Sequence, residues 1–142
     1  MVRSAGSGYT LKIVARDLTG YVVASIITPA FTVYVGSVFQ LQFHSYVSSA
    51  IGGTPFKPSP SVAVVDRGGN IVSTYNGGSC RISLSMTPTG VEQLQPISNT
   101  YSTFQYGISQ FDGLSINASG FPYELLFNAS SAQVSVIQYS TR

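Results

Sequence analysis

Charged side chains are scarce in this sequence of 142 residues: Asp, Glu, Lys and Arg make up 8% of it, whereas 44% of the residues are hydrophobic. Solubility must therefore come from hydroxyl and amide side chains and from glycine. The formal net charge is +2, and the basic residues are dispersed without a run. The sequence shows no basic patch for nucleic acid, and its composition suits an extracellular, glycosylated or tightly assembled β-protein better than a cytosolic enzyme.

Cysteine is represented by Cys80 alone, so the chain can form no internal disulfide and no thiolate metal cluster of its own. We expect Cys80 to be a small apolar residue on a strand. Long apolar runs are missing too, because nothing approaches the roughly 18 residues of a membrane span. The first residues also lack the apolar core of a secretory signal, so a secreted protein would be represented here by a mature piece or a fragment.

Sustained helical periodicity is absent as well, and short alternating segments separated by turn residues take its place. Eight or nine such segments predict an all-β chain, an immunoglobulin-like antiparallel β-sandwich with Greek-key topology preceded by a β-hairpin. Residues 1–29 are assigned to the hairpin, which Pro29 ends, and residues 30–142 to the sandwich.

The clearest alternation lies in residues 38–47 and predicts a central strand. Its inward side chains would be Phe39, Leu41, Phe43 and Val47, and the residues between them would face outward.

Residues 111–131 read as two alternating strands joined by a Gly/Pro corner. One face would carry the inward residues Leu114, Ile116, Tyr123, Leu125 and Phe127. The opposite face, with Ser115, Asn117, Glu124 and Asn128, would meet water or sugar. Asn117 and Asn128 each open an Asn-x-Ser sequon, so both are candidate sites for attached glycans if the chain passes through a pathway that glycosylates asparagine.

Two segments of the chain echo each other. Tyr9, Leu11, Ile13 and Ala15 stand 114 positions before Tyr, Leu, Phe and Ala residues at 123–129, and both segments precede a strand rich in Val or Ile. A spacing of this size fits one immunoglobulin-like domain plus a short connection, so the hairpin resembles the last two strands of a preceding repeat. Chance likeness between alternating strands that follow a glycine is the alternative.

Three further segments carry a family resemblance: Val-Ala-Val-Val-Asp-Arg-Gly-Gly-Asn-Ile-Val at 62–72, Phe-Asp-Gly-Leu-Ser-Ile at 111–116 and Tyr-Glu-Leu at 123–125. With these, residues 31–140 resemble the tandem immunoglobulin-like repeats of large extracellular surface proteins, including bacterial invasin-type adhesins and similar algal and protist repeats. The resemblance implies stalks, spacers and adhesive fibres at the cell surface, with recognition usually placed in a separate tip domain.

Candidate chemistry is sparse. His44, the only histidine, lies among outward glutamines without a sharp nucleophile turn, so we expect no catalytic site. Asp66 and Asn70 form the best pair for calcium, but a tight turn explains both, and we expect no metal and no cofactor. The tyrosines that are not assigned to the core could form an exposed surface for contacts between subunits or, as the less favoured alternative, for sugar rings in a lectin; they are Tyr46, Tyr75, Tyr101, Tyr106 and Tyr139.

The leading hypothesis is a structural module of an extracellular filament, stalk or adhesin. A hairpin with an apolar face and unpaired edges is stable only when a neighbour covers it, and that neighbour would be an adjacent repeat or another copy of the chain. The candidate assembly residues are Tyr9, Leu11, Ile13, Val22 and Ile26. The alternative is a monomeric carbohydrate-binding or cell-adhesion module whose hairpin folds back onto its own sheet.

Overall fold

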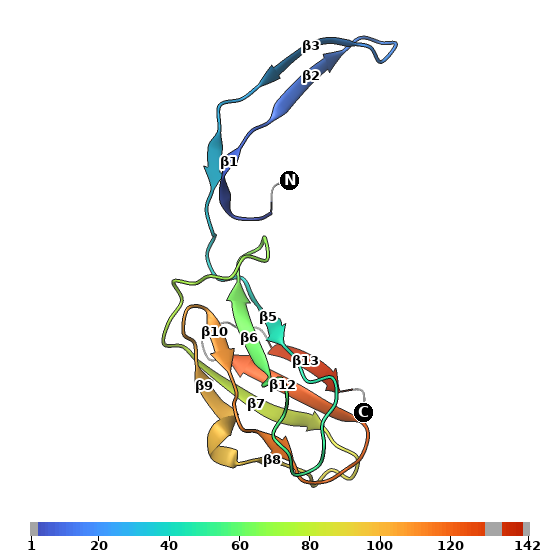
Figure 1. Ribbon diagram of the computed structural model, residues 1–142, viewed down its shortest axis with the longest axis vertical. Coiled ribbons are helices and arrows are strands. Elements are labelled where there is room, and N and C mark those ends of the chain that lie inside the picture. The colour runs from blue at the N-terminus through green and yellow to red at the C-terminus, as the bar shows by residue number, and fades with distance from the viewer. Residues whose placement is uncertain (1–2, 130–134, 141–142) are drawn as a thin grey trace.

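The computed structural model describes residues 3–129 and 135–140, and the regular secondary structure of this part of the chain is almost entirely β-strand (Figure 1). Helical structure within it is confined to one 3₁₀ turn, η1 (Ile97–Thr100), and no helix there is long and apolar enough to cross a membrane. The strands are β1 (Gly6–Tyr9), β2 (Lys12–Arg16), β3 (Val22–Ile27), β4 (Phe31–Val33), β5 (Gln40–Ser45), β6 (Ser61–Val65), β7 (Ser79–Met86), β8 (Leu94–Gln95), β9 (Tyr101–Thr103), β10 (Ile108–Gln110), β11 (Ser115–Ile116), β12 (Tyr123–Ala129) and β13 (Ser135–Ser140).

Two antiparallel sheets form the sandwich. One has the strand order β13-β12-β7-β9 and the other the order β10-β6-β5, while β8 and β11 form a short ladder at the end of the sandwich far from β1 (Figure 1). Strands distant in the sequence are neighbours in both sheets, as β7 beside β12 and β6 beside β10 show, so the chain crosses between layers as in a Greek key. The predicted immunoglobulin-like antiparallel sandwich, preceded by a hairpin, is confirmed.

The core fills the space between the two sheets. All five residues of β6 are buried, because this strand lies in the middle of its sheet. Phe127 makes edge contacts with Phe43 and Phe111, at ring-centroid distances of 5.9 and 5.7 Å. Cys80 is buried on β7, as predicted. Other fully buried apolar side chains are Val62, Val64, Ile82, Phe104 and Leu114.

The prediction for residues 38–47 is partly wrong. Leu41 and Val47 are buried, but β5 lies at the edge of its sheet rather than in the centre. Phe39 is 48% exposed, and the Arg67 guanidinium lies 4.9 Å from its ring centroid. Alternation predicts which side chains share one face of a strand, but it does not show whether a neighbouring element will cover Phe39, which directly precedes β5.

The inward residues predicted for residues 111–131 are all buried, but the outward face is only half right. Ser115 is buried on β11, which lies between β8 and the loop at 51–56; the backbone amides of Gly53 and Phe56 in this loop donate hydrogen bonds to the carbonyls of Ile116 and Leu114. Glu124 is buried on the central strand β12, and its carboxylate accepts a 3.0 Å hydrogen bond from the Ser85 hydroxyl. Asn117 and Asn128 are exposed, as expected.

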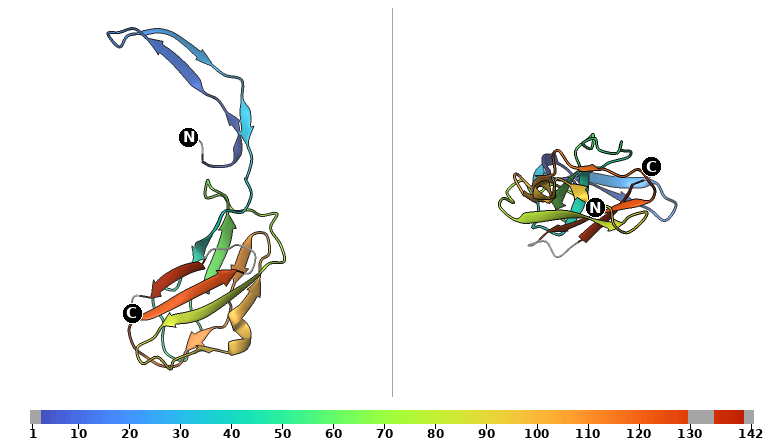
Figure 2. Two further views of the ribbon diagram at one scale, coloured as in Figure 1. Left: turned by 180° about the vertical axis from the view of Figure 1, so that it is seen from behind. Right: turned by 90° about the horizontal axis from the view of Figure 1, so that it is seen from below.

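The hairpin stands away from the sandwich as an extended arm, which comprises residues 6–33 (Figures 1 and 2). β2 pairs with β3, and β1 pairs with β4, so the two chains of the arm remain side by side along most of its length. No described residue of the sandwich adds a strand to either pair. The arm therefore does not fold back onto its own sheet, as the monomeric alternative required.

Candidate functional site

The apolar face of the arm is exposed, and no other described strand covers it. Leu11, Ile13 and Ile26 are 49%, 58% and 66% exposed. Ile13 pairs directly with Ile26, and Leu11 follows two residues from Ile13 in the same alternating phase, so the three share one face. Exposed aliphatic side chains on one face of a thin ribbon make this face a candidate interaction surface.

Four of the predicted assembly residues are exposed on the arm, namely Leu11, Ile13, Val22 and Ile26. Tyr9 is half-buried, because its ring packs against Phe31 with 6.1 Å between centroids. Val22 follows a register shift near Arg16, so strand alternation does not place it on the face of Ile13. The part these residues play in assembly remains a prediction.

The tip of the arm is a well-tied turn. One carboxylate oxygen of Asp17 accepts hydrogen bonds from the backbone amides of Thr19 and Tyr21 and from the Thr19 hydroxyl, at 2.6 to 3.0 Å. The hydrogen bond from the hydroxyl is the main reason that the pKa of Asp17 is lowered. Arg16 adds a 2.7 Å bond from its guanidinium to the Gly20 carbonyl. The turn thus holds β2 and β3 together where no other layer supports them.

The base of the arm is joined to the sandwich around Asp66, which lies at the end of β6. Its carboxylate accepts hydrogen bonds from the backbone amides of Gly36, Gly68 and Asn70, each 2.8 or 2.9 Å long, and from the Asn70 side chain. The side-chain oxygen of Asn70 in turn accepts a 2.8 Å hydrogen bond from the backbone amide of Ala5. We call these five residues the joint, because they tie both chains of the arm's base to one turn of the sandwich.

The joint accounts for the Asp-Arg-Gly-Gly-Asn motif without a metal. Donation from the Gly36 amide, followed by donation from Asn70, holds the pKa of Asp66 at about 2, below its usual 3.8. Both carboxylate oxygens are surrounded by N–H groups, and such donors repel a cation. Gly69 has a φ of +85°, which the tight turn requires and glycine adopts without strain. Within the described residues, no three acidic, His or Cys side chains gather as metal ligands would.

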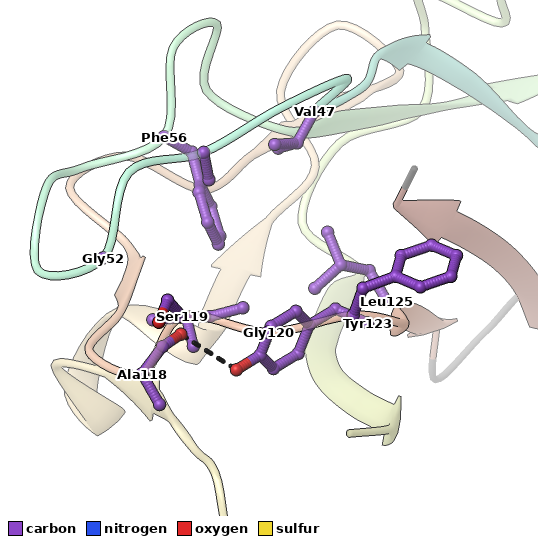
Figure 3. Close-up of a pocket in the computed structure, with 11 residues that line it drawn as sticks. Val47, Gly52, Phe56, Ala118, Ser119, Gly120, Tyr123 and Leu125 are labelled. Carbon is purple, nitrogen blue, oxygen red and sulfur yellow. Dashed lines mark hydrogen bonds between the residues drawn. The ribbon is translucent and has the colours of Figure 1, made fainter. Parts of the chain in front are cut away.

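A hollow of about 310 Å³ opens at the end of the sandwich far from the arm (Figure 3). Val47 and Phe56 lie on one side of it, and Tyr123 and Leu125 on the other. No charged side chain lines it, and the Tyr123 hydroxyl is already engaged, because it donates a 2.9 Å hydrogen bond to the Ala118 carbonyl. Sequence analysis missed this hollow, since two loops with no shared motif build it.

The remaining predicted candidates do not converge. Asn117 and Asn128 are exposed, and Ser130 of the second sequon lies outside the described residues. His44 is exposed on β5, and the shallow depression beside it is lined by no carboxylate.

The tyrosines considered for subunit contacts or sugar binding do not gather at the hollow either. Tyr46, Tyr101 and Tyr106 are exposed, but none of them lines the hollow of Figure 3. Tyr75 packs edge-on against Phe104 at 5.3 Å, and the side chain of Tyr139 lies outside the described residues.

Comparison with known proteins supports the fold alone. The sequence matches no protein-family model and no curated protein. Among solved structures, the chain is similar to a glycosyl hydrolase family 2 member from Bacteroides cellulosilyticus, with a TM-score of 0.51 and 15% sequence identity. The likeness covers 96% of this chain but 18% of that one, so this chain corresponds to a small part of a much longer protein. Because only 4% of the chain is left out, the likeness takes in most of the arm together with the sandwich.

Proposed function

We propose that this chain is a non-enzymatic structural module of an extracellular filament, stalk or surface adhesin, and that it joins its neighbours through the arm. The observation that carries this proposal is the exposure of Leu11, Ile13 and Ile26 on a two-stranded ribbon that no other described strand covers. A lone two-stranded hairpin is marginally stable in water, and unpaired strand edges bind other strands. A neighbour that covers the arm supplies both missing contacts.

The resemblance to tandem immunoglobulin-like repeats of surface proteins supports the same proposal. So does the low charge, because hydroxyl and amide groups keep such a surface soluble without ionised side chains. The module is proposed to lie outside the cell or at its surface, with other copies or adjacent repeats as partners and with glycans on Asn117 and Asn128 where the source attaches them.

Self-association of the chain tests the proposal. Light scattering over a concentration series should show oligomers for the unaltered chain and a monomer for the double variant Ile13→Asp, Ile26→Asp. The two new carboxylates lie opposite each other, and two neighbouring negative charges cannot be buried in an apolar interface. Leu18→Asp is the control, since it adds a negative charge at the exposed tip, away from the apolar face, and should leave association unchanged. A monodisperse monomer at all concentrations for the unaltered chain would favour the monomeric adhesion module instead.

A further inference from the structure

The start of the arm repeats a specific hydrogen bond of the sandwich. The Tyr9 hydroxyl donates to the Ser4 carbonyl at 3.0 Å, and the Tyr123 hydroxyl donates to the Ala118 carbonyl at 2.9 Å, which Figure 3 shows as a dashed line. In both cases the acceptor lies five residues before the tyrosine. The donors are 114 positions apart and so are the acceptors, the same spacing that relates the two echoing segments.

Glycine occupies the same place in both copies. Gly6 and Gly120 each precede the tyrosine by three residues, and a Cβ added at either glycine would lie 3.3 or 3.7 Å from the tyrosine hydroxyl. A tyrosine that begins a strand and donates back to the chain just upstream is the tyrosine corner of immunoglobulin-like sandwiches. Tyr123 begins β12, the strand that pairs with both β7 and β13. Tyr9 ends β1 and begins the run that continues into β2.

The residues that follow the two tyrosines have equivalent places but opposite surroundings. Leu125 and Phe127 on β12 are buried in the core, whereas their counterparts Leu11 and Ile13 are exposed. Each hairpin also pairs this position with an aliphatic residue: Phe127 is opposite Val136 on β13, nine positions later, and Ile13 is opposite Ile26 on β3, thirteen positions later. The arm thus has the antiparallel pairing and the apolar face of the last hairpin of a sandwich, although its register differs, and it lacks the rest of that sandwich.

We infer that the arm is the last hairpin of a second immunoglobulin-like sandwich, whose remaining strands precede it in the same polypeptide. This inference rests on the proposed function and names the partner that the arm requires. That partner presents an antiparallel edge strand to β2, as β7 does to β12, and an open apolar core to Leu11 and Ile13. A second copy of this chain can cover the exposed face by association, but it cannot supply this open core, because β12 and β13 already occupy the place in its own sandwich.

A fusion protein tests the inference. The fusion consists of a copy of residues 37–117 followed by the chain from Ser4 onward. Ser4 then directly follows the copied Asn117 and takes the place that Ala118 has in the native sequence. The arm should then complete the added sandwich. Amide hydrogens at residues 11–15 and 24–28 should exchange at least about a hundredfold more slowly than in the unfused chain, because they move from a lone ribbon into a covered sheet.

Matched variants decide the outcome. Leu11→Asp with Ile13→Asp in the fusion should abolish the added protection, whereas Leu18→Asp at the tip should leave it unchanged. Because Ile13 is smaller than Phe127, Ile13→Phe is made in the fusion as well, to match the size of the core residue in the copied sandwich. If the arm exchanges as fast in the fusion as in the unfused chain, with and without Ile13→Phe, the inference is overturned. Self-association of the unfused chain is measured separately, so either proposal can fail while the other stands.

Discussion

Asp66 holds its negative charge against several N–H donors, and this makes the joint sensitive to acid. The pKa of Asp66 is about 2 in the folded chain and that of Glu92, bonded to Thr89, is also about 2. A carboxyl whose pKa is lowered by folding stabilises the folded state above its usual pKa, and this contribution is lost as the pH falls from about 4 to about 2.

We therefore expect the urea concentration at which half of the chain is unfolded, followed by circular dichroism, to decrease as the pH is lowered from 5 to 2. Asp66→Asn should lower the midpoint at pH 7 and flatten its decline in acid, since the amide places an N–H group against other donors. Asp17→Asn is the control, because Asp17 serves only the turn at the tip of the arm. An Asp66→Asn variant with an unchanged midpoint at pH 7 would contradict this account of the joint.

Tyr123 and Tyr9 make the same hydrogen bond in different surroundings, so the pair forms an internal control. Tyr123→Phe should lower the free energy of unfolding by about 1 kcal/mol, because it leaves the part-buried Ala118 carbonyl without its donor. Tyr9→Phe should change the value little in the unfused chain, where the Ser4 carbonyl can bond to water. Urea unfolding of both variants measures the difference, and equal losses would show that burial does not distinguish the two corners.

Cys80 should be unreactive while the chain is folded. Burial raises the pKa of its thiol to about 11, so roughly one thiol in a thousand is ionised at pH 8, and only the thiolate reacts with common reagents. Labelling by iodoacetamide at pH 8 should be negligible without urea and complete in denaturing urea. Rapid labelling without urea would mean that β7 opens from the sandwich.

At the scale of elements, β12 is the strand on which the sandwich depends most. It is flanked by β7 and β13, and its Phe127 contacts aromatic rings from two other segments. Phe127→Ala should lower the free energy of unfolding by about 3–5 kcal/mol, since it removes a fully buried ring from a core with little room to collapse. Phe121→Ala, at an exposed position before β12, should cost under about 1 kcal/mol in the same urea titration. A loss of similar size at both positions would be inconsistent with the burial described.

The sequence predicted these elements unevenly, for physical reasons. Alternation identified the buried side of β12, because the period of a strand is fixed by backbone geometry. It placed Glu124 on the outside, since alternation cannot show that the strand would become central and that Ser85 would satisfy the carboxylate. The turn at Asp66 was predicted from its residue types, whereas its bond to Gly36, 30 positions away, could be seen only in the fold. The hollow beside Tyr123 was missed because loop contacts leave no periodic signal.

At the scale of the whole molecule, two regions differ in what supports them. The sandwich has two layers and a continuous core, whereas the arm consists of two successive two-stranded ladders in a single layer and has an exposed face. In the unfused, monomeric chain we expect amides of β2 and β3 to exchange many times faster than those of β6 and β12, because local opening of the arm exposes little additional apolar surface. Hydrogen exchange with mass spectrometry on dilute samples measures this. Uniform protection of arm and sandwich in a monomer would show that the arm gains support from within the chain.

The joint has a mechanical consequence for any array of such modules. The arm is long and narrow, and the hydrogen bonds around Asp66 secure its base to the end of β6. A slight pivot there is amplified with distance, so it displaces the far tip much more than it disturbs the residues that turn. The pitch and stiffness of a fibre built from these modules would therefore be set by one carboxylate and the amides that surround it.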